Sequence, residues 1–210
     1  MTEPASATSA FPANVLADLE EMESQDLIPV AESICRHALK RLPTSDSKNR
    51  FKIGMKLLKY LISCTEEPLP SENIEEAIKI LRQLADFITR NNRTKMTDSW
   101  LFLGYLFQRR QRGSRISNLK EAFKWYSLAR RAYERRRTRR DLALATVALG
   151  EVYAALGGKD NFDKAIRLTK EALRIYTPKQ YPDDNTYYRR AVEQFRAQRD
   201  RVGVKAKVNK

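Results

Sequence analysis

Residues 145–182 read ATVALGEVYAALGGKDNFDKAIRLTKEALRIYTPKQYP, and this stretch decides the fold. In its first half, four residues recur at i, i+3, i+4 and i+7, a spacing that places them on one helix face: Thr146, Leu149, Gly150 and Tyr153. Gly157 and Gly158 then interrupt the periodicity, and Asp160 or Asn161 is placed to cap a second helix. The stretch therefore predicts a helix hairpin.

The second helix of this hairpin has one apolar side, which is formed by Phe162, Ala165, Ile166, Thr169, Ala172, Leu173 and Tyr176. Pro178 and Pro182 stop its continuation because proline cannot extend a helix interior. A single hairpin cannot bury its apolar face alone. We therefore expect neighbouring hairpins of the same design.

Two such neighbours lie upstream in the sequence. The motif Asn118-Leu119-x-x-Ala122-Phe123 matches Asn161-Phe162-x-x-Ala165-Ile166 at an offset of 161 − 118 = 43 residues. The motif Asn73-Ile74-x-x-Ala77-Ile78 precedes it by 118 − 73 = 45 residues. The predicted helix that precedes Asn118 carries a second match. Its motif Trp100-x-x-Leu103-Gly104-x-x-Phe107 corresponds to Thr146-x-x-Leu149-Gly150-x-x-Tyr153.

Gly104 and Gly150 fall in the middle of predicted helices, where glycine is less favourable than alanine by about 0.5–1 kcal/mol. The presence of these unfavourable glycines is explained if a second helix must approach the backbone closely at both points. Ala122 and Ala165 are the small residues that we expect to face the two glycines.

These motifs resemble the tetratricopeptide repeat (TPR), whose pattern is Trp-x2-Leu-Gly-x2-Tyr followed by Ala, Phe and Ala on the partner helix. The longer period and the turn Tyr176-Thr177-Pro178-Lys179-Gln180-Tyr181-Pro182 are similar to the long-period variety found with caspase-like CHAT domains. The resemblance covers about Lys48 to Phe195. It implies a right-handed α-solenoid of about three helix hairpins that mediates protein–protein interaction.

Few glycines and little Val/Ile/Thr alternation disfavour strands, so we expect an all-α protein. We expect a disordered N-terminus at 1–11, an N-terminal helical pair (a cap or degenerate repeat) at 12–43, the TPR-like array with a C-terminal capping helix at 44–202, and a basic flexible tail at 203–210. The expected helices are 12–22, 25–42, 48–63, 71–90, 97–111, 118–136, 139–156, 161–176 and 184–201. The linker 43–47 is expected to supply a helix cap.

The sequence contains no pattern typical of a catalytic, cofactor or metal site. The lone His37 lies two residues from Cys35, so the two point to different sides of a helix. Gly157-Gly158-Lys159-Asp160 lacks the upstream glycine and the following Ser/Thr of a phosphate-binding loop. We therefore expect no enzyme activity, no cofactor and no metal.

The chain shows no secretory signal and no apolar run long enough to span a membrane. Cys35 and Cys64 lie apart without a CxxC motif, which favours two buried, reduced thiols over a disulfide. These features predict a cytoplasmic protein.

A partner-binding groove is expected on the first helix of each pair, on the face next to the core positions. It comprises Asp98, Leu101, Tyr105 and Gln108 on one helix and Leu144, Val147, Glu151 and Ala154 on the next. Its apolar centre, formed by Leu101, Tyr105, Leu144 and Val147, suits a peptide or a partner helix. The alternative is that the N-terminal helices or a second copy fill this groove.

The net charge of +14 is concentrated in residues 109–140, which hold 13 basic residues and two acidic ones. Residues 1–50, in contrast, carry five basic and eight acidic groups. A predicted helix, 118–136, runs between the first and the last of these arginines. The arginines therefore fall at its two ends, which form two separate edges. These edges comprise Arg109, Arg110, Arg112 and Arg115 at one end and Arg131, Arg135, Arg136, Arg137, Arg139 and Arg140 at the other.

Three interpretations of these arginines remain open: a solvated face, a docking site for an acidic protein surface, and a site for nucleic-acid phosphates. Our favoured hypothesis is a non-catalytic adaptor or scaffold that binds a protein partner through its groove and arginine-rich edges. Such a protein would regulate a separately encoded effector. The alternative is a basic α-solenoid that binds nucleic acid.

Overall fold

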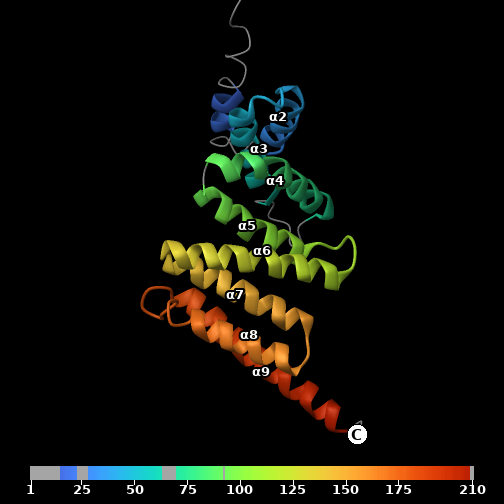
Figure 1. The fold of residues 1–210 in the computed structure, drawn as a ribbon, viewed down its shortest axis with the longest axis vertical. Coiled ribbons are helices and arrows are strands. Elements are labelled where there is room, and N and C mark those ends of the chain that lie inside the picture. The colour runs from blue at the N-terminus through green and yellow to red at the C-terminus, as the bar shows by residue number, and fades with distance from the viewer. Residues whose placement is uncertain (1–14, 23–27, 63–69, 92, 209–210) are drawn as a thin grey trace, which may run out of the picture. The chain divides into compact units, whose positions relative to one another are not determined.

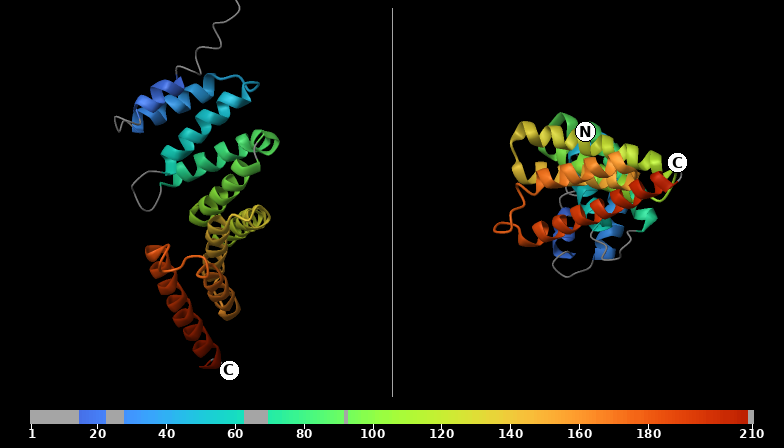
Figure 2. Two further views of the ribbon diagram at one scale, coloured as in Figure 1. Left: turned by 90° about the vertical axis from the view of Figure 1, so that its left-hand side faces the viewer. Right: turned by 90° about the horizontal axis from the view of Figure 1, so that it is seen from below.

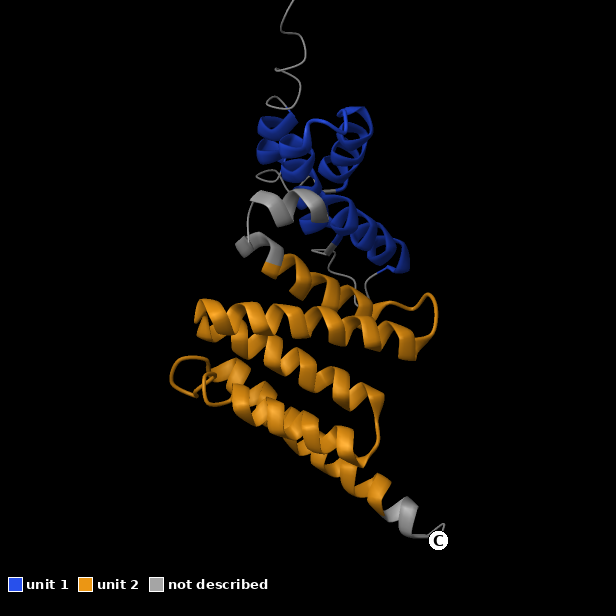
Figure 3. Ribbon diagram, viewed as in Figure 1, with its two compact units in different colours: residues 1–93 blue, residues 94–210 orange. Residues whose placement is uncertain are grey.

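The computed structural model describes residues 15–22, 28–62, 70–91 and 93–208. Within these ranges the chain is helical and contains no strand, which confirms the all-α prediction (Figure 1). The predicted disordered segment 1–11 lies outside the described residues. The chain divides into two compact units, residues 1–93 and 94–210 (Figure 3). This division falls inside the region 44–202 that was predicted as one array.

Unit 1 consists of a short helix at 15–22 followed by α2 (Ile28–Arg41), α3 (Ser47–Ile62) and α4 (Ser71–Asn91). Helix α3 packs between α2 and α4. One face of α3 is buried, and it comprises Phe51, Gly54, Leu57, Leu58 and Leu61. Pro29 lies in the first turn of α2, where a helix tolerates proline. Cys35 is a buried thiol, while Cys64 lies outside the described residues.

Polar side chains fix the ends of the helices in unit 1. Asp46 caps α3, because its Oδ1 accepts a hydrogen bond from the backbone N–H of Asn49 at 3.3 Å. Arg50 donates through Nη1 to the carbonyls of Leu39 and Leu42 at 2.8 and 2.7 Å, which satisfies the C-terminal end of α2. The prediction that the linker 43–47 supplies a cap is confirmed.

Unit 2 contains α5 (Arg93–Arg109), α6 (Arg115–Arg136), α7 (Arg139–Leu156), α8 (Lys159–Ala172) and α9 (Pro182–Val208). From α6 onward, each helix packs against the next one along the chain (Figures 1 and 2). Leu103 and Phe107 are buried on the core side of α5, as predicted. Trp100 was expected on the same buried face, but it is only partly buried against Ala129 and Tyr133.

Both mid-helix glycines are buried and lie in close contact with another helix. A Cβ added at Gly150 would lie 3.3 Å from the carbonyl oxygen of Ala165, so the predicted approach of these two residues is confirmed. A Cβ at Gly104 would lie 2.5 Å from ring carbons of Tyr126. The close approach predicted at Gly104 therefore exists, but an aromatic ring fills it and the predicted partner Ala122 does not.

Two helix ends differ from the prediction. Helix α8 begins at Lys159 with Gly158 as its N-cap residue, so neither Asp160 nor Asn161 occupies the cap position. Helix α9 begins at Pro182 and continues to Val208. The N–H that proline lacks would have no partner within the helix at this first position. Helix α9 therefore includes most of the segment 203–210 that was predicted as a flexible tail.

The recurring asparagine has one structural role in all three motifs. Asn118 donates through Nδ2 to the carbonyls of Arg110 and Arg112 at 3.1 and 3.0 Å. Asn161 donates to the carbonyl of Gly157 at 2.7 Å, and Asn73 donates to that of Leu61 at 3.4 Å. In each hairpin, the asparagine of the second helix thus ties down the end of the first helix or the loop that follows it.

The three asparagines should differ in their contribution to stability. We expect Asn118→Ala to lower the free energy of unfolding by about 2–3 kcal/mol, because it removes from a buried group the two bonds that Nδ2 donates and the long bond that Oδ1 accepts from Arg110. Asn161→Ala should lower it by about 1 kcal/mol and Asn73→Ala by about 0.5 kcal/mol. Urea denaturation followed by circular dichroism measures this order. An Asn73→Ala effect as large as that of Asn118→Ala would contradict it.

Candidate interaction surface

The predicted groove residues of α5 lie along one side of that helix and are neither fully buried nor fully exposed. Asp98 accepts a hydrogen bond at 2.8 Å from the hydroxyl of Tyr133. Leu101 packs against the core cluster that contains Tyr133. The ring of Tyr105 lies beneath the guanidinium of Arg109, whose Cζ is 4.6 Å from the ring centroid. The helix thus presents one carboxylate, one aliphatic side chain and one cation-covered ring.

Gln108 and Glu151 join α5 to α7 in the middle of this surface. Nε2 of Gln108 donates to Oε2 of Glu151 at 3.4 Å. Oε1 of Gln108 accepts from the hydroxyl of Tyr126 at 2.9 Å. Burial raises the pKa of Glu151, while its hydrogen bond to Gln108 and the charge of Arg109 act in the opposite direction. Gln108 and Glu151, which were both predicted in the groove, are thus in contact.

Val147 was predicted in the groove, and this prediction is wrong. Its side chain is only 3% exposed and packs in a core cluster with Ala143, Tyr176 and Tyr188. Tyr188 belongs to α9, so the capping helix covers this position of α7. Leu144, one helical turn before Val147, remains 40% exposed, and Ala154 is partly exposed.

Tyr187 of α9 was not among the residues predicted for this surface. Tyr187 is 61% exposed on α9, and the charge of Glu151 is the largest cause of its raised pKa. Its ring lies edge-on to that of Tyr188 at 5.3 Å, and Tyr188 packs in the same cluster as Val147 of α7. We refer below to the groove face, which comprises Asp98, Leu101, Tyr105, Gln108, Leu144, Glu151 and Tyr187. The repeat motifs do not include α9, so the sequence pattern could not place Tyr187. Its position follows from the packing of α9 against α7.

The predicted arginine-rich edges lie at the two ends of α6. This helix holds 22 residues, so at 1.5 Å per residue its ends are about 33 Å apart. We call the group at its C-terminal end the α6–α7 edge; it comprises Arg131, Arg135, Arg136, Arg137, Arg139 and Arg140. All six are exposed. The α5–α6 edge comprises Arg109, Arg110, Arg112 and Arg115.

The α6–α7 edge is a tight turn crowded with cations. Arg137 ends α6 in the left-handed backbone region at φ 57°. Arg139 and Arg140 are the first two residues of α7, where the positive end of the helix dipole disfavours a cation. Arg136 and Arg140 lie over the rings of Tyr133 and Tyr181 at 5.9 and 5.6 Å. Glu134 is the single acidic residue among residues 131–140.

The α5–α6 edge is more engaged in internal contacts. Arg115 donates through Nη1 to the carbonyl of Gln108. Arg110 donates to Oδ1 of Asn118 at 3.5 Å and lies over the ring of Phe107 at 5.8 Å. Arg112 is exposed. Because several of its side chains support the loop that precedes α6, this edge offers fewer uncommitted arginines than the α6–α7 edge.

Arg130 belongs to the same basic stretch but has a structural role. It donates through Nε to Oγ1 of Thr146 at 3.1 Å and through Nη2 to Glu171 at 2.8 Å. The guanidinium therefore connects α6 with both α7 and α8. The spacing of basic residues alone does not separate the partly buried Arg130 from the exposed arginines around it.

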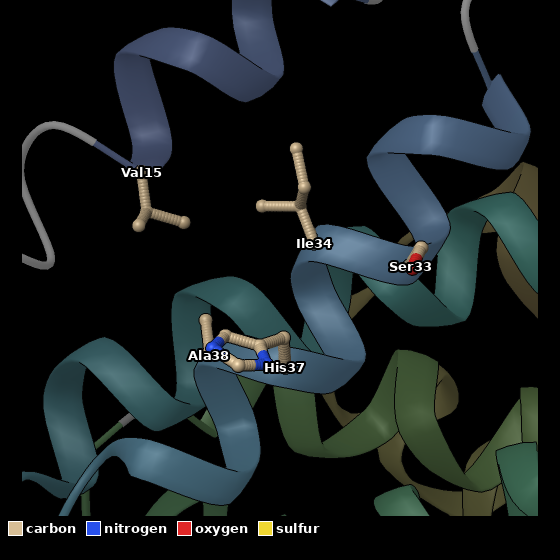
Figure 4. A pocket seen from close by; sticks show the side chains of 5 residues that line it. All are labelled: Val15, Ser33, Ile34, His37 and Ala38. Atoms are coloured by element: carbon tan, nitrogen blue, oxygen red, sulfur yellow. The ribbon is translucent and has the colours of Figure 1, made fainter.

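Unit 1 contains a hollow of about 340 Å³ beside α2 (Figure 4). It is lined by Val15, Ser33, Ile34, His37 and Ala38. Among the described side chains, no hydrogen bond joins Ser33 to His37, although the two lie one helical turn apart. A nucleophile needs an adjacent base at hydrogen-bond distance, so this hollow shows no catalytic arrangement.

The chain matches no known family model, and no curated protein is detectably similar to it. None of the described helices has both the length and the apolar character needed to cross a bilayer. Among the residues that the structure describes, no group of three or more His, Cys, Asp or Glu side chains is placed to hold a metal ion.

Proposed function

We propose that this protein is a non-catalytic helical-repeat adaptor that binds an acidic protein partner. In this proposal α3/α4, α5/α6 and α7/α8 are three TPR-like hairpins of a right-handed α-solenoid, and α9 is its cap. The protein acts in the cytoplasm and regulates a separately encoded effector. The repeated asparagine contacts and the two close glycine approaches support the repeat assignment.

The α6–α7 edge carries the proposal of an acidic partner. Six exposed arginines and one glutamate occupy ten consecutive residues, 131–140. The cations at the start of α7 are opposed by the helix dipole, so a bound carboxylate would relieve an existing repulsion. Arginine forks pair with carboxylates in a bidentate manner and accelerate encounter with an acidic surface.

Charge reversal of this edge tests the proposal. We expect the variant with Arg135, Arg136, Arg137, Arg139 and Arg140 all changed to Glu to lose at least tenfold in affinity for a partner captured from native cells and identified by mass spectrometry. Tenfold corresponds to about 1.4 kcal/mol. The matched control reverses five other exposed cations of unit 2, namely Arg167, Lys170, Arg174, Lys179 and Arg190. Equal losses in both variants, or none in either, would contradict a specific arginine edge.

Nucleic-acid binding is the second candidate, and the net charge of +14 favours it. The separation of the two edges by about 33 Å argues against one continuous phosphate track. The two functions differ in their response to salt. A protein with six to ten phosphate contacts loses about 10³–10⁵ in affinity between 50 and 200 mM salt. A labelled 20-base-pair duplex, titrated at both salt concentrations, distinguishes the candidates.

A further inference from the structure

The chain itself contains an acidic counterpart to the α6–α7 edge. Residues 1–35 hold seven acidic residues and no lysine or arginine. Five of the seven fall within residues 18–26, which we call the acidic segment: Asp18, Glu20, Glu21, Glu23 and Asp26. The net charge of this segment is −5, and that of residues 131–140, with six arginines and one glutamate, is +5. The two stretches are therefore opposite in sign and equal in net charge.

The helix at 15–22 presents the first half of the acidic segment with its carboxylates outward. Val15 and Leu19 are 8% and 0% exposed, so they anchor this helix in unit 1. Asp18, Glu20 and Glu21 point to other sides of the helix and are exposed. Among the described residues, neither Asp18 nor Glu20 has a cation as an ion-pair partner. Because the helix is already formed, these carboxylates lose less conformational freedom on binding than those of an unfolded peptide.

The arginines of the α6–α7 edge are equally accessible. All six are exposed, and none of them forms an ion pair with a carboxylate in the part of the chain that the structure describes. Arg136 and Arg140 lie over aromatic rings, and Nε of Arg135 donates to the carbonyl of Arg131. Each guanidinium has five N–H donors, so these contacts leave donors for a carboxylate. Arginine binds carboxylates through two parallel hydrogen bonds, which suits an acidic segment as the ligand.

We propose that the acidic segment of one copy docks on the α6–α7 edge of a second copy. This inference rests on the proposed function, because it takes the edge to be a docking site for acidic protein surfaces. Each copy carries one acidic segment and one edge, so the contact is heterologous and can repeat along a chain of copies or close into a ring. The groove face takes no part in it. An acidic partner must then displace the second copy, so self-association regulates access to the edge.

The contact should be weak and strongly dependent on salt, since exposed ion pairs contribute little individually and are screened by ions. Sedimentation velocity of the full chain over a range of protein concentrations measures it. We expect association that increases with concentration at about 0.1 M salt and is lost at about 1 M, where the Debye length falls to about 3 Å. Sedimentation that is independent of concentration at the lower salt would overturn the inference. Association that survives the higher salt would also overturn it.

Two variants identify the two surfaces. The first neutralises the acidic segment with D18N, E20Q, E21Q, E23Q and D26N, and the second is the charge-reversed α6–α7 edge described above. Each alone should associate at least tenfold more weakly than the unmodified chain. An equimolar mixture should recover a heterodimer, because the acidic segment of the second variant meets the intact edge of the first. A mixture that stays monomeric while the unmodified chain associates would refute the contact, and circular dichroism checks that both variants are folded.

The matched control changes the net charge by the same amount as the first variant. It neutralises five exposed acids outside the acidic segment, namely Glu72, Asp160, Asp183, Glu193 and Asp200. The control should associate like the unmodified chain, and an equal loss in both would overturn a specific segment. Capture of another protein through the α6–α7 edge by a chain that stays monomeric would retain the adaptor function and reject this inference alone. Self-association through the edge without capture of any other protein would do the reverse.

Discussion

Replacing Gly104 with leucine is expected to lower the free energy of unfolding by about 3 kcal/mol or more. The first added carbon would already lie 2.5 Å from the ring of Tyr126. This ring is 3% exposed and its hydroxyl is bonded to Gln108, so it cannot move aside freely. The leucine must therefore push α5 away from α6. Thermal or urea unfolding of the purified variant measures the loss.

Gly203 is the matched control for this substitution. It also lies within a helix, α9, but a Cβ added there meets no atom within 4 Å. Gly203→Ala should be neutral or should stabilise the protein by up to about 1 kcal/mol, because alanine favours the helix. A Gly104→Leu variant as stable as the unmodified chain would mean that α5 and α6 are not in contact at this point. Gly150→Leu should also destabilise, since Ala165 contributes a backbone oxygen at 3.3 Å.

The sequence predicted where helices come close, but not always what lies between them. The glycine in a helix interior is a local signal, because it is unfavourable unless a neighbour requires the space. Which neighbour occupies this space depends on how far α5 and α6 are rotated about their axes. At Gly150 the predicted Ala165 is in contact, whereas at Gly104 the ring of Tyr126 takes the place expected for Ala122.

Among the predicted groove residues, Gln108 and Glu151 are in contact, whereas Val147 is buried by α9. Gln108 and Glu151 lie one repeat apart, so the same periodicity that defines the hairpins brings them together. Val147 and Tyr187 depend on the position of α9, which no motif of the repeat specifies. The packing of α9 buries Val147 against Tyr188 and leaves Tyr187 exposed. Tertiary contacts of this kind are absent from the periodic pattern of a single chain.

The arginine stretch shows a similar limit. Charge counting locates a cationic region, but it gives every arginine the same weight. The structure separates Arg130, which bridges Thr146 and Glu171, from Arg139 and Arg140, which lie exposed at the start of α7. Helical spacing alone places Arg130 and Arg131 about 100° apart, and only the position of α7 decides that Arg130 is the partly buried one.

Tyr133→Ala is expected to lower the free energy of unfolding by about 3–5 kcal/mol. The ring is 2% exposed, packs with Ala129 and Ala145, and donates its hydroxyl to Asp98 at 2.8 Å. Tyr133→Phe keeps the ring and removes only the hydrogen bond, so it should lower the free energy by about 1 kcal/mol. Urea denaturation of both variants compares the contribution of the packed ring with that of the hydrogen bond to Asp98. Equal losses would show that the hydrogen bond to Asp98, and not the packing, dominates.

The same pair of variants predicts how stability changes in alkaline solution. Burial, followed by the bond to Asp98, raises the pKa of Tyr133 above the ordinary tyrosine value of 10.0. Above pH 10 the unfolded chain therefore loses this proton while the folded chain keeps it, so stability must fall as pH rises. Burial also raises the pKa of Tyr126 and Tyr188, and they add to the fall. Tyr133→Phe removes one of these protons, so its stability should decline less steeply above pH 10 than that of the unmodified chain. An identical alkaline slope would mean that the phenol of Tyr133 is open to water and that α5 and α6 do not enclose it.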